Sequence, residues 1–152
     1  MMNQISKSIT VVSLMVNINK EIPLSKEEVG DQYIAGNIFQ REIGNMDREN
    51  FAVLCLDTKG FPTCLSIAHI GTLNQTLLHI REIFKIAIVS NSNSIIVGHN
   101  HPSGDVNPSK EDIEKTKNIV EAGKVLGISV LDHIVVSSRE ASSMRNIYPN
   151  IF

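Results

Sequence analysis

Strand-type and helix-type segments alternate along this chain, and the alternation restricts the folds it can adopt. Runs rich in β-branched residues predict strands, whereas apolar residues spaced three and four apart predict helices. We expect strands at Ile9–Ile18, Phe51–Leu56, Phe61–Ile67, Ser94–Gly98 and Val130–Val136, and helices at Ser25–Ile43, Ile80–Val89 and Ser109–Gly123. Strands that alternate with helices are typical of the α/β class or of mixed α+β domains.

Local signals define two of these elements more closely. The stretch Ser25–Glu28 has the spacing of a capping box, which predicts the start of a helix. The residues Asp57–Gly60 separate two strand-type runs and predict a hairpin. With a two-residue turn at Lys59-Gly60, Cys55 and Cys64 face each other across the strands. We interpret these cysteines as reduced core residues and not as a disulfide.

Length and composition indicate one soluble domain over residues 1–152. Hydrophobic residues make up 42% and charged residues 20% of the chain, which is ordinary for a folded globular protein. The net charge of −2 and the scattered lysines and arginines argue against nucleic-acid binding. No run has the length of a membrane helix. The apolar N-terminal run weakly resembles a signal peptide but lacks a small-residue cleavage site, so we expect a strand there and a cytoplasmic protein.

Polar residues suited to metal binding follow the apolar run Ser94–Gly98 directly. His99 and His101 are two residues apart, so an extended backbone projects both imidazoles in the same direction. Two imidazoles suit zinc, which takes a third protein ligand at catalytic sites. Asp112 is the candidate third ligand, because a short loop returns the chain towards the end of the strand.

Each of these residues also has a purely structural explanation. A His-x-His pair is common in proteins that bind no metal. Ser109 and Asp112 have the spacing of a capping box, and the helix dipole favours an acid in the first turn. The combination of two same-face histidines, a tight turn and a returning acid favours a metal site over a helix cap alone.

The same stretch carries a family resemblance. His99-Asn100-His101, followed by ten residues and Asp112, resembles the H-x-H-x(10)-D signature of the JAMM/MPN+ metallopeptidases. The fuller string HNHPSGD is similar to the RadC family of bacterial proteins, and further matches lie at Arg48–Phe51, Gly71–Leu73, Arg81–Lys85, Leu126–Ile128 and Leu131–Val135. The resemblance covers roughly residues 25–138. It implies a three-layer MPN/JAB-like α/β domain, with a curved mixed sheet flanked by helices as in cytidine deaminases.

The resemblance also implies a role for each residue of the motif. His99, His101 and Asp112 would hold one zinc ion per chain, Glu49 would act as general base, and Ser109 would help to stabilise an oxyanion. The implied reaction is the hydrolysis of a peptide or isopeptide amide, with a peptide or protein as substrate.

Other candidates for these roles stay open. Glu49 also fits a solvated acid at the start of a strand, and Glu82 is the second candidate base, although Arg81 beside it favours a structural ion pair. His133 fits a core histidine better than a fourth ligand. A zinc nucleobase deaminase is excluded by its motifs, because H-x-E and P-C-x-x-C are both missing from the sequence.

Two alternative functions and one assembly question remain at this stage. The domain could be a non-catalytic binding module on the MPN scaffold, or the DNA-repair accessory that the family's traditional name suggests. Residues 1–44 show no helix-hairpin-helix pattern of the kind that longer members use for DNA, which argues against the second. The exposed edge of a strand such as Ile9–Ile18 would allow a homodimer.

Overall fold

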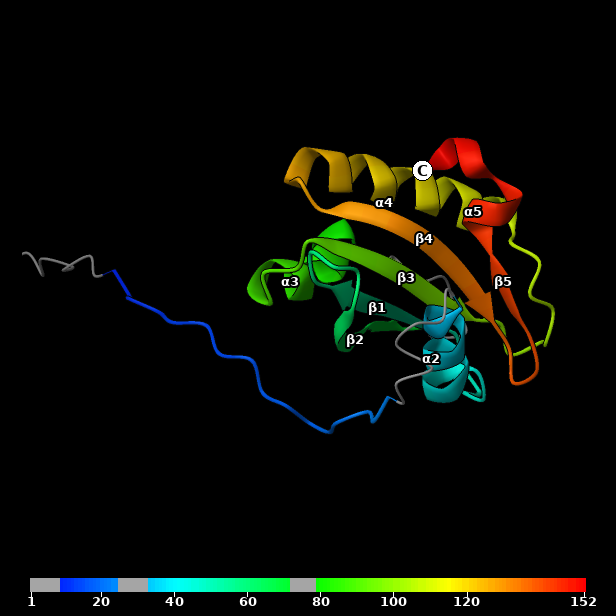
Figure 1. The fold of residues 1–152 in the computed structure, drawn as a ribbon, viewed down its shortest axis with the longest axis horizontal. Coiled ribbons are helices and arrows are strands. Elements are labelled where there is room, and N and C mark those ends of the chain that lie inside the picture. The colour runs from blue at the N-terminus through cyan, green and yellow to red at the C-terminus, as the bar shows by residue number, and fades with distance from the viewer. Residues whose placement is uncertain (1–8, 25–32, 72–78) are drawn as a thin grey trace, which may run out of the picture.

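A mixed five-stranded sheet organises the part of the chain that the computed structural model describes, residues 9–24, 33–71 and 79–152 (Figure 1). The strand order is β2-β1-β3-β4-β5, and only β3 and β4 are parallel. The strands are β1 (Asn50–Leu56), β2 (Pro62–Ile70), β3 (Ser94–Asn100), β4 (Ser129–Val136) and β5 (Ala141–Ser143). The helices are α2 (Ile34–Ile43), α3 (Ile80–Val89), α4 (Lys110–Leu126) and α5 (Met144–Ile147), followed by a 3-10 turn at Pro149–Ile151.

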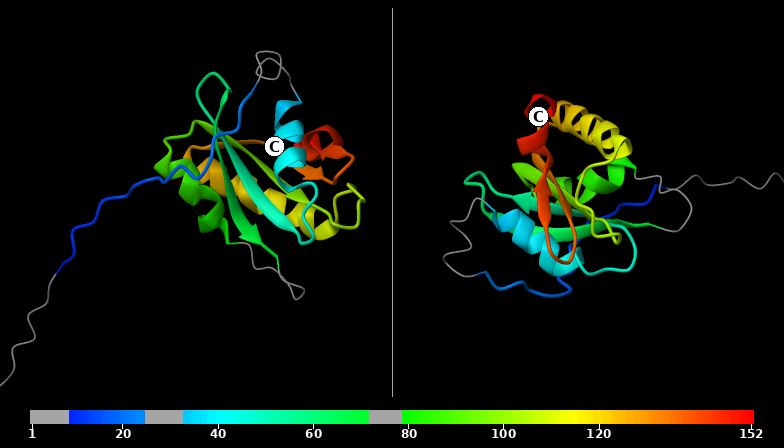
Figure 2. Two further views of the ribbon diagram at one scale, coloured as in Figure 1. Left: turned by 90° about the horizontal axis from the view of Figure 1, so that it is seen from below. Right: turned by 90° about the vertical axis from the view of Figure 1, so that its right-hand side faces the viewer.

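Helices cover both faces of the sheet, which gives the three layers that the family resemblance implies (Figure 2). On one face, α3 and α4 pack against alternate residues of β1 and β3, such as Val53 and Val97. On the other face, α2 packs against the intervening residues, such as Ala52 and Leu54. β1 is buried along its whole length because it lies inside the sheet with apolar layers on both sides.

Gly98 lets α2 approach the strand that carries the histidines. A Cβ atom on Gly98 would lie 2.7 Å from the ring of Phe39, closer than carbon atoms can pack. The ring of Phe39 is fully buried and fills this space on the face opposite His99. Phe39 therefore fixes the backbone of β3 at Gly98, the residue before His99, from the face that α2 covers.

Most of the predicted elements are present, with shifted ends. β3 continues two residues beyond Gly98 and α4 continues to Leu126. The hairpin is confirmed and Cys55 lies opposite Cys64, but its connection spans 57–61 instead of a two-residue turn, because Asp57 accepts from the amides of Lys59 and Phe61. The predicted capping box at Ser25–Glu28 lies outside the described residues.

The predicted strand at Ile9–Ile18 is wrong. These residues are extended, join no strand of the described chain and leave their apolar side chains exposed, Ile9 at 95% and Val11 at 94%. A β-branched run favours extended backbone, but a strand also needs a neighbouring strand to bond with. Among all the described residues, no helix combines the length and the apolar character needed to cross a membrane.

Candidate metal centre

The predicted metal ligands meet where β3 ends and α4 begins. β3, α4 and β4 form a crossover between parallel strands, so the loop after β3 leads directly into α4. His99 is buried on the α4 side of the sheet. The amide of His101 donates to the carbonyl of Val136 at 2.9 Å, which continues the pairing with β4 past the end of the strand. Both imidazoles therefore project in one direction, as their spacing predicts.

The ligand atoms of the three residues lie within 4.8 Å of one another. His99 Nε2 is 3.0 Å from His101 Nε2 and 3.4 Å from Asp112 Oδ1. His101 Nε2 is 3.5 Å from Asp112 Oδ2. Ligands bound at 2.0–2.1 Å to a tetrahedral zinc ion are about 3.3–3.4 Å apart, so the observed separations bracket the value that zinc requires.

Asp112 belongs to a helix cap and to this cluster at the same time. Its Oδ2 accepts hydrogen bonds from the Ser109 amide at 2.8 Å and the Ser109 hydroxyl at 2.6 Å. Its own amide donates to Ser109 Oγ at 3.1 Å, which completes the capping box of α4. Its Oδ1 faces His99. The cap and the metal ligand are thus compatible, since they use different oxygen atoms.

A hydrogen-bonded chain behind His99 defines its tautomer. Thr116 Oγ1 donates to the carbonyl of Asp112 at 2.6 Å, so its oxygen can only accept from His133 Nδ1, also at 2.6 Å. His133 Nε2 is then an acceptor, and it lies 2.8 Å from His99 Nδ1. The proton of His99 is therefore on Nδ1, and Nε2 presents a lone pair to the cluster. Burial lowers the pKa of His133 well below 6.5, in agreement with a neutral ring.

His101 is oriented in the same way. Its Nδ1 lies 2.6 Å from the carbonyl of Asp105, which can only accept, so Nε2 is free to face the cluster. The lone pairs of the two imidazoles and the Asp112 carboxylate then point to one place, and this arrangement favours a bound positive charge. The hydrogen bond with Asp112 raises the pKa of His101, so the negative charge of Asp112 favours a positive charge at this place. Burial opposes ionisation of Asp112, but its contacts with His101 and His99, together with the hydrogen bond from Ser109, outweigh burial and hold the pKa of that carboxyl far below 3.8.

An aromatic contact supports the buried side of the cluster. The ring of Phe51 in β1 stacks on His99 with an interplanar angle of 5° and meets His133 edge-on. All three side chains are buried. Water is thereby excluded from the inner side of the cluster, while His101 keeps part of its surface exposed.

Glu49 approaches the cluster from the loop between α2 and β1. It is exposed, and its negative charge contributes to the raised pKa of His101. The loop is held by Asn100, which is fully buried between the two histidines and points the opposite way. Asn100 Oδ1 accepts from the Asn50 amide at 2.6 Å, and its Nδ2 donates to the Arg48 carbonyl at 2.9 Å. Both residues that flank Glu49 are therefore bonded to the strand that carries the histidines.

The remaining candidates lie elsewhere or are engaged otherwise. Ser109 directs its hydroxyl to Asp112. Glu82 faces solvent on α3, where its ion pair with Lys85 lowers its pKa. His69 of β2 pairs with Phe51 of β1, and the buried Nε2 of His69 has no hydrogen-bond partner in the described structure.

Two residues that support the site, Asn100 and Thr116, were not predicted from the sequence. Thr116 follows Asp112 by four residues, which places both on the same helix face, so this spacing could have identified Thr116.

Comparison with known proteins gives one consistent family. Residues 31–148 match the family described as a RadC-like JAB domain. A UPF0758 protein of Finegoldia magna is 45% identical over 134 residues, which are 86% of this chain and 60% of the relative. A UPF0758 protein of Staphylococcus epidermidis is 41% identical over 127 residues, 84% of this chain and 56% of the relative. The chain therefore spans little more than half the length of these curated relatives.

Proposed function

The chain belongs to the RadC-like JAB domain family, and on that premise we propose that it is a zinc-dependent hydrolase of peptide or isopeptide amides. The observation that carries the proposal is the convergence of His99 Nε2, His101 Nε2 and an Asp112 oxygen within 4.8 Å. The hydrogen bonds behind the histidines place the proton of each neutral ring on Nδ1, so both Nε2 atoms are available to a cation. A zinc ion held there would supply Lewis-acid activation of water and of the substrate carbonyl.

The protein's own side chains would supply the proton transfer. Glu49 is the proposed general base, because it is an exposed carboxylate near His101 on a loop fixed by Asn100. It would take a proton from the attacking water and return it to the leaving amine. Ser109 is the proposed donor to the oxyanion, a role that requires its hydroxyl to turn away from Asp112 Oδ2.

The substrate side of the proposal rests on exposure. His101 and Glu49 are the solvent-facing members of the site, whereas His99 and Asp112 are buried. A substrate would therefore approach over the loop that carries Glu49. Because the chain spans little more than half of its relatives, other parts of such a protein could contribute to substrate selection.

Metal content is the first test. Untagged protein purified without chelators should contain about one zinc per chain, and Asp112→Asn should lose it while keeping an oxygen for the Ser109 cap. Glu111→Ala is the matched control, since Glu111 is an exposed acid in the same helical turn. A wild-type protein that takes up no zinc, iron or manganese would refute the metal centre and leave a non-catalytic binding module.

Activity is the second test. Metal-loaded protein should cleave members of a peptide and isopeptide library in a chelator-sensitive manner. Glu49→Gln should abolish cleavage and retain the metal, whereas Asp47→Asn, on the same exposed loop, should change neither. Equal cleavage by wild type and Glu49→Gln would remove Glu49 from the mechanism but leave the metal centre intact.

A further inference from the structure

Two thiols form a pair in the sheet, away from the candidate metal centre. Cys55 of β1 and Cys64 of the edge strand β2 are direct partners in the antiparallel register, and both are free cysteines. Residues directly opposed in this way have Cα atoms about 4.5–5.5 Å apart, which lies inside the 4.4–6.8 Å range of disulfides. Both side chains belong to the layer between the sheet and α3. Directly opposed positions of this kind have the spacing that a disulfide needs.

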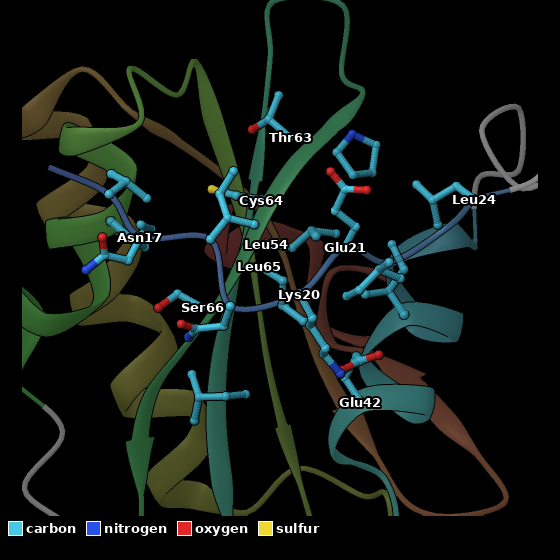
Figure 3. Close-up of a pocket in the computed structure, with 18 residues that line it drawn as sticks. Asn17, Lys20, Glu21, Leu24, Glu42, Leu54, Thr63, Cys64, Leu65 and Ser66 are labelled. Carbon is cyan, nitrogen blue, oxygen red and sulfur yellow. The ribbon is translucent and has the colours of Figure 1, made fainter.

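The two thiols differ in their access to solvent. Cys55 is completely buried, whereas Cys64 is only partly buried. Cys64 also lines a cavity of about 730 Å³ between β2 and the extended segment 16–24, where it lies beside Thr63 (Figure 3). A cavity of this size admits a small polar solute such as a hydroperoxide. Reagents in solution therefore reach Cys64 before Cys55.

The surroundings also make the two thiols chemically unequal. The thiol of Cys55 donates to Cys64, and this bond, with smaller contributions from Ser90 and Thr63, lowers the pKa of Cys64 to about 6 despite partial burial. The same interaction and burial raise the pKa of Cys55. The lowered pKa favours the thiolate at Cys64, and the thiolate is the reactive form of cysteine.

We propose that Cys64 and Cys55 form a peroxide-reactive dithiol that closes to a cross-strand disulfide. The Cys64 thiolate attacks the terminal oxygen of the hydroperoxide: an S–O bond forms, the O–O bond breaks, and the leaving oxygen takes a proton from solvent and departs as water or an alcohol. Cys64 is oxidised by two electrons to the sulfenic acid, and the peroxide is reduced. Cys55 then attacks the Cys64 sulfur: the S–S bond forms, the S–O bond breaks, and water leaves with the proton of Cys55. The disulfide links β1 to β2.

Treatment of the wild-type protein with hydrogen peroxide tests the proposal. Free thiols, counted after denaturation, should fall from two to none per chain, and peptide mapping without reductant should find Cys55 joined to Cys64 with the loss of two hydrogen atoms. Dithiothreitol should restore both thiols. Recovery of both free thiols after peroxide, or a Cys64 sulfinic acid without any disulfide, would overturn the proposal.

Two variants separate the roles of the thiols. In Cys55→Ala the sulfenic acid on Cys64 has no partner and should be trapped by dimedone. In Cys64→Ser the remaining thiol, the buried Cys55, should react with peroxide at least about tenfold more slowly than the wild-type protein, because Cys55 lacks the thiolate character of Cys64. Equal rates for the wild type and Cys64→Ser would contradict the assignment of Cys64 as the nucleophile. These readouts use no metal or amide substrate, so they are independent of the proposed hydrolase activity.

Discussion

The backbone amide of Asn50 donates to the side-chain oxygen of Asn100 at 2.6 Å, and this bond joins the loop of the proposed base to the strand of the histidines. Asn100 also holds the carbonyls of Met46 and Arg48. A single buried amide side chain therefore fixes the loop on both sides of Glu49. The carbonyl of Glu49 itself accepts from the amide of Gly71 at 2.7 Å, so Asn100 and Gly71 together hold this part of the chain.

Asn100→Ala should destabilise the protein by about 2–4 kcal/mol, because the Asn50 amide and the Met46 carbonyl lose their partner, whereas the Arg48 carbonyl keeps the bond from Asn50 Nδ2. The variant should retain its metal and lose hydrolytic kcat, since the ligands stay in place while Glu49 is released. Denaturant unfolding, metal analysis and kinetics measure the three effects. Asn118→Ala, an exposed position of α4, is the control. Full activity in Asn100→Ala would show that the loop needs no such anchor.

His133→Leu should weaken zinc binding by about 10–100-fold, because it removes the acceptor that keeps the proton on His99 Nδ1. Chelator competition measures the affinity. Thr116→Ser keeps the hydroxyl that supports His133, so its affinity should match the wild type. If both variants bind zinc as the wild type does, the chain behind His99 has no influence on the metal.

The metal-free protein should be most stable at mildly acidic pH. The folded-state pKa of His101 is raised above 6.5, so its contribution is complete below that value and is lost as pH rises through the folded pKa. The pKa of Asp112 is lowered below 3.8, so its contribution is present above that value and is lost as pH falls. Urea unfolding across this range in the presence of a chelator measures both slopes. His101→Gln should abolish the alkaline decline, and an unchanged decline would assign it to another group.

Gly98→Ala should cost about 1–3 kcal/mol, since the new methyl group overlaps the ring of Phe39. The double variant Gly98→Ala/Phe39→Leu should recover part of this loss, because the smaller side chain leaves room for the methyl group. Unfolding free energies of the two single variants and the double variant give the coupling between the sites. Strictly additive losses would mean that the strain is relieved elsewhere.

The sequence was sufficient for features that depend on local spacing. Residues i and i+2 of an extended backbone share a face, so the common direction of His99 and His101 followed directly, and the short loop placed Asp112 near them. The hairpin followed from its turn residues, and Cys55 and Cys64 meet as predicted although the connection is longer than the predicted two-residue turn. Each of these relations involves residues that one element or one turn connects.

Long-range contacts were beyond local reasoning. Asn100 bonds to residues about fifty positions earlier, and only the packing of β1 against β3 brings them together. The run Ile9–Ile18 has the composition of a strand, yet strand formation depends on a partner that composition does not specify. The structural and the metal-binding explanations of Asp112 could not be separated either, because the residue satisfies both.

The shared use of Asp112 limits how this site can change. Replacement by cysteine or histidine would offer a softer ligand but would lose the two short hydrogen bonds that the Asp112 carboxylate accepts from Ser109. A redesign for copper or a thiolate-preferring metal would therefore keep only half of the capping box, the bond from the amide of residue 112 to Ser109 Oγ. A carboxylate is therefore favoured at this position by the helix cap as well as by the metal. This double requirement restricts the metals for which the site can be adapted.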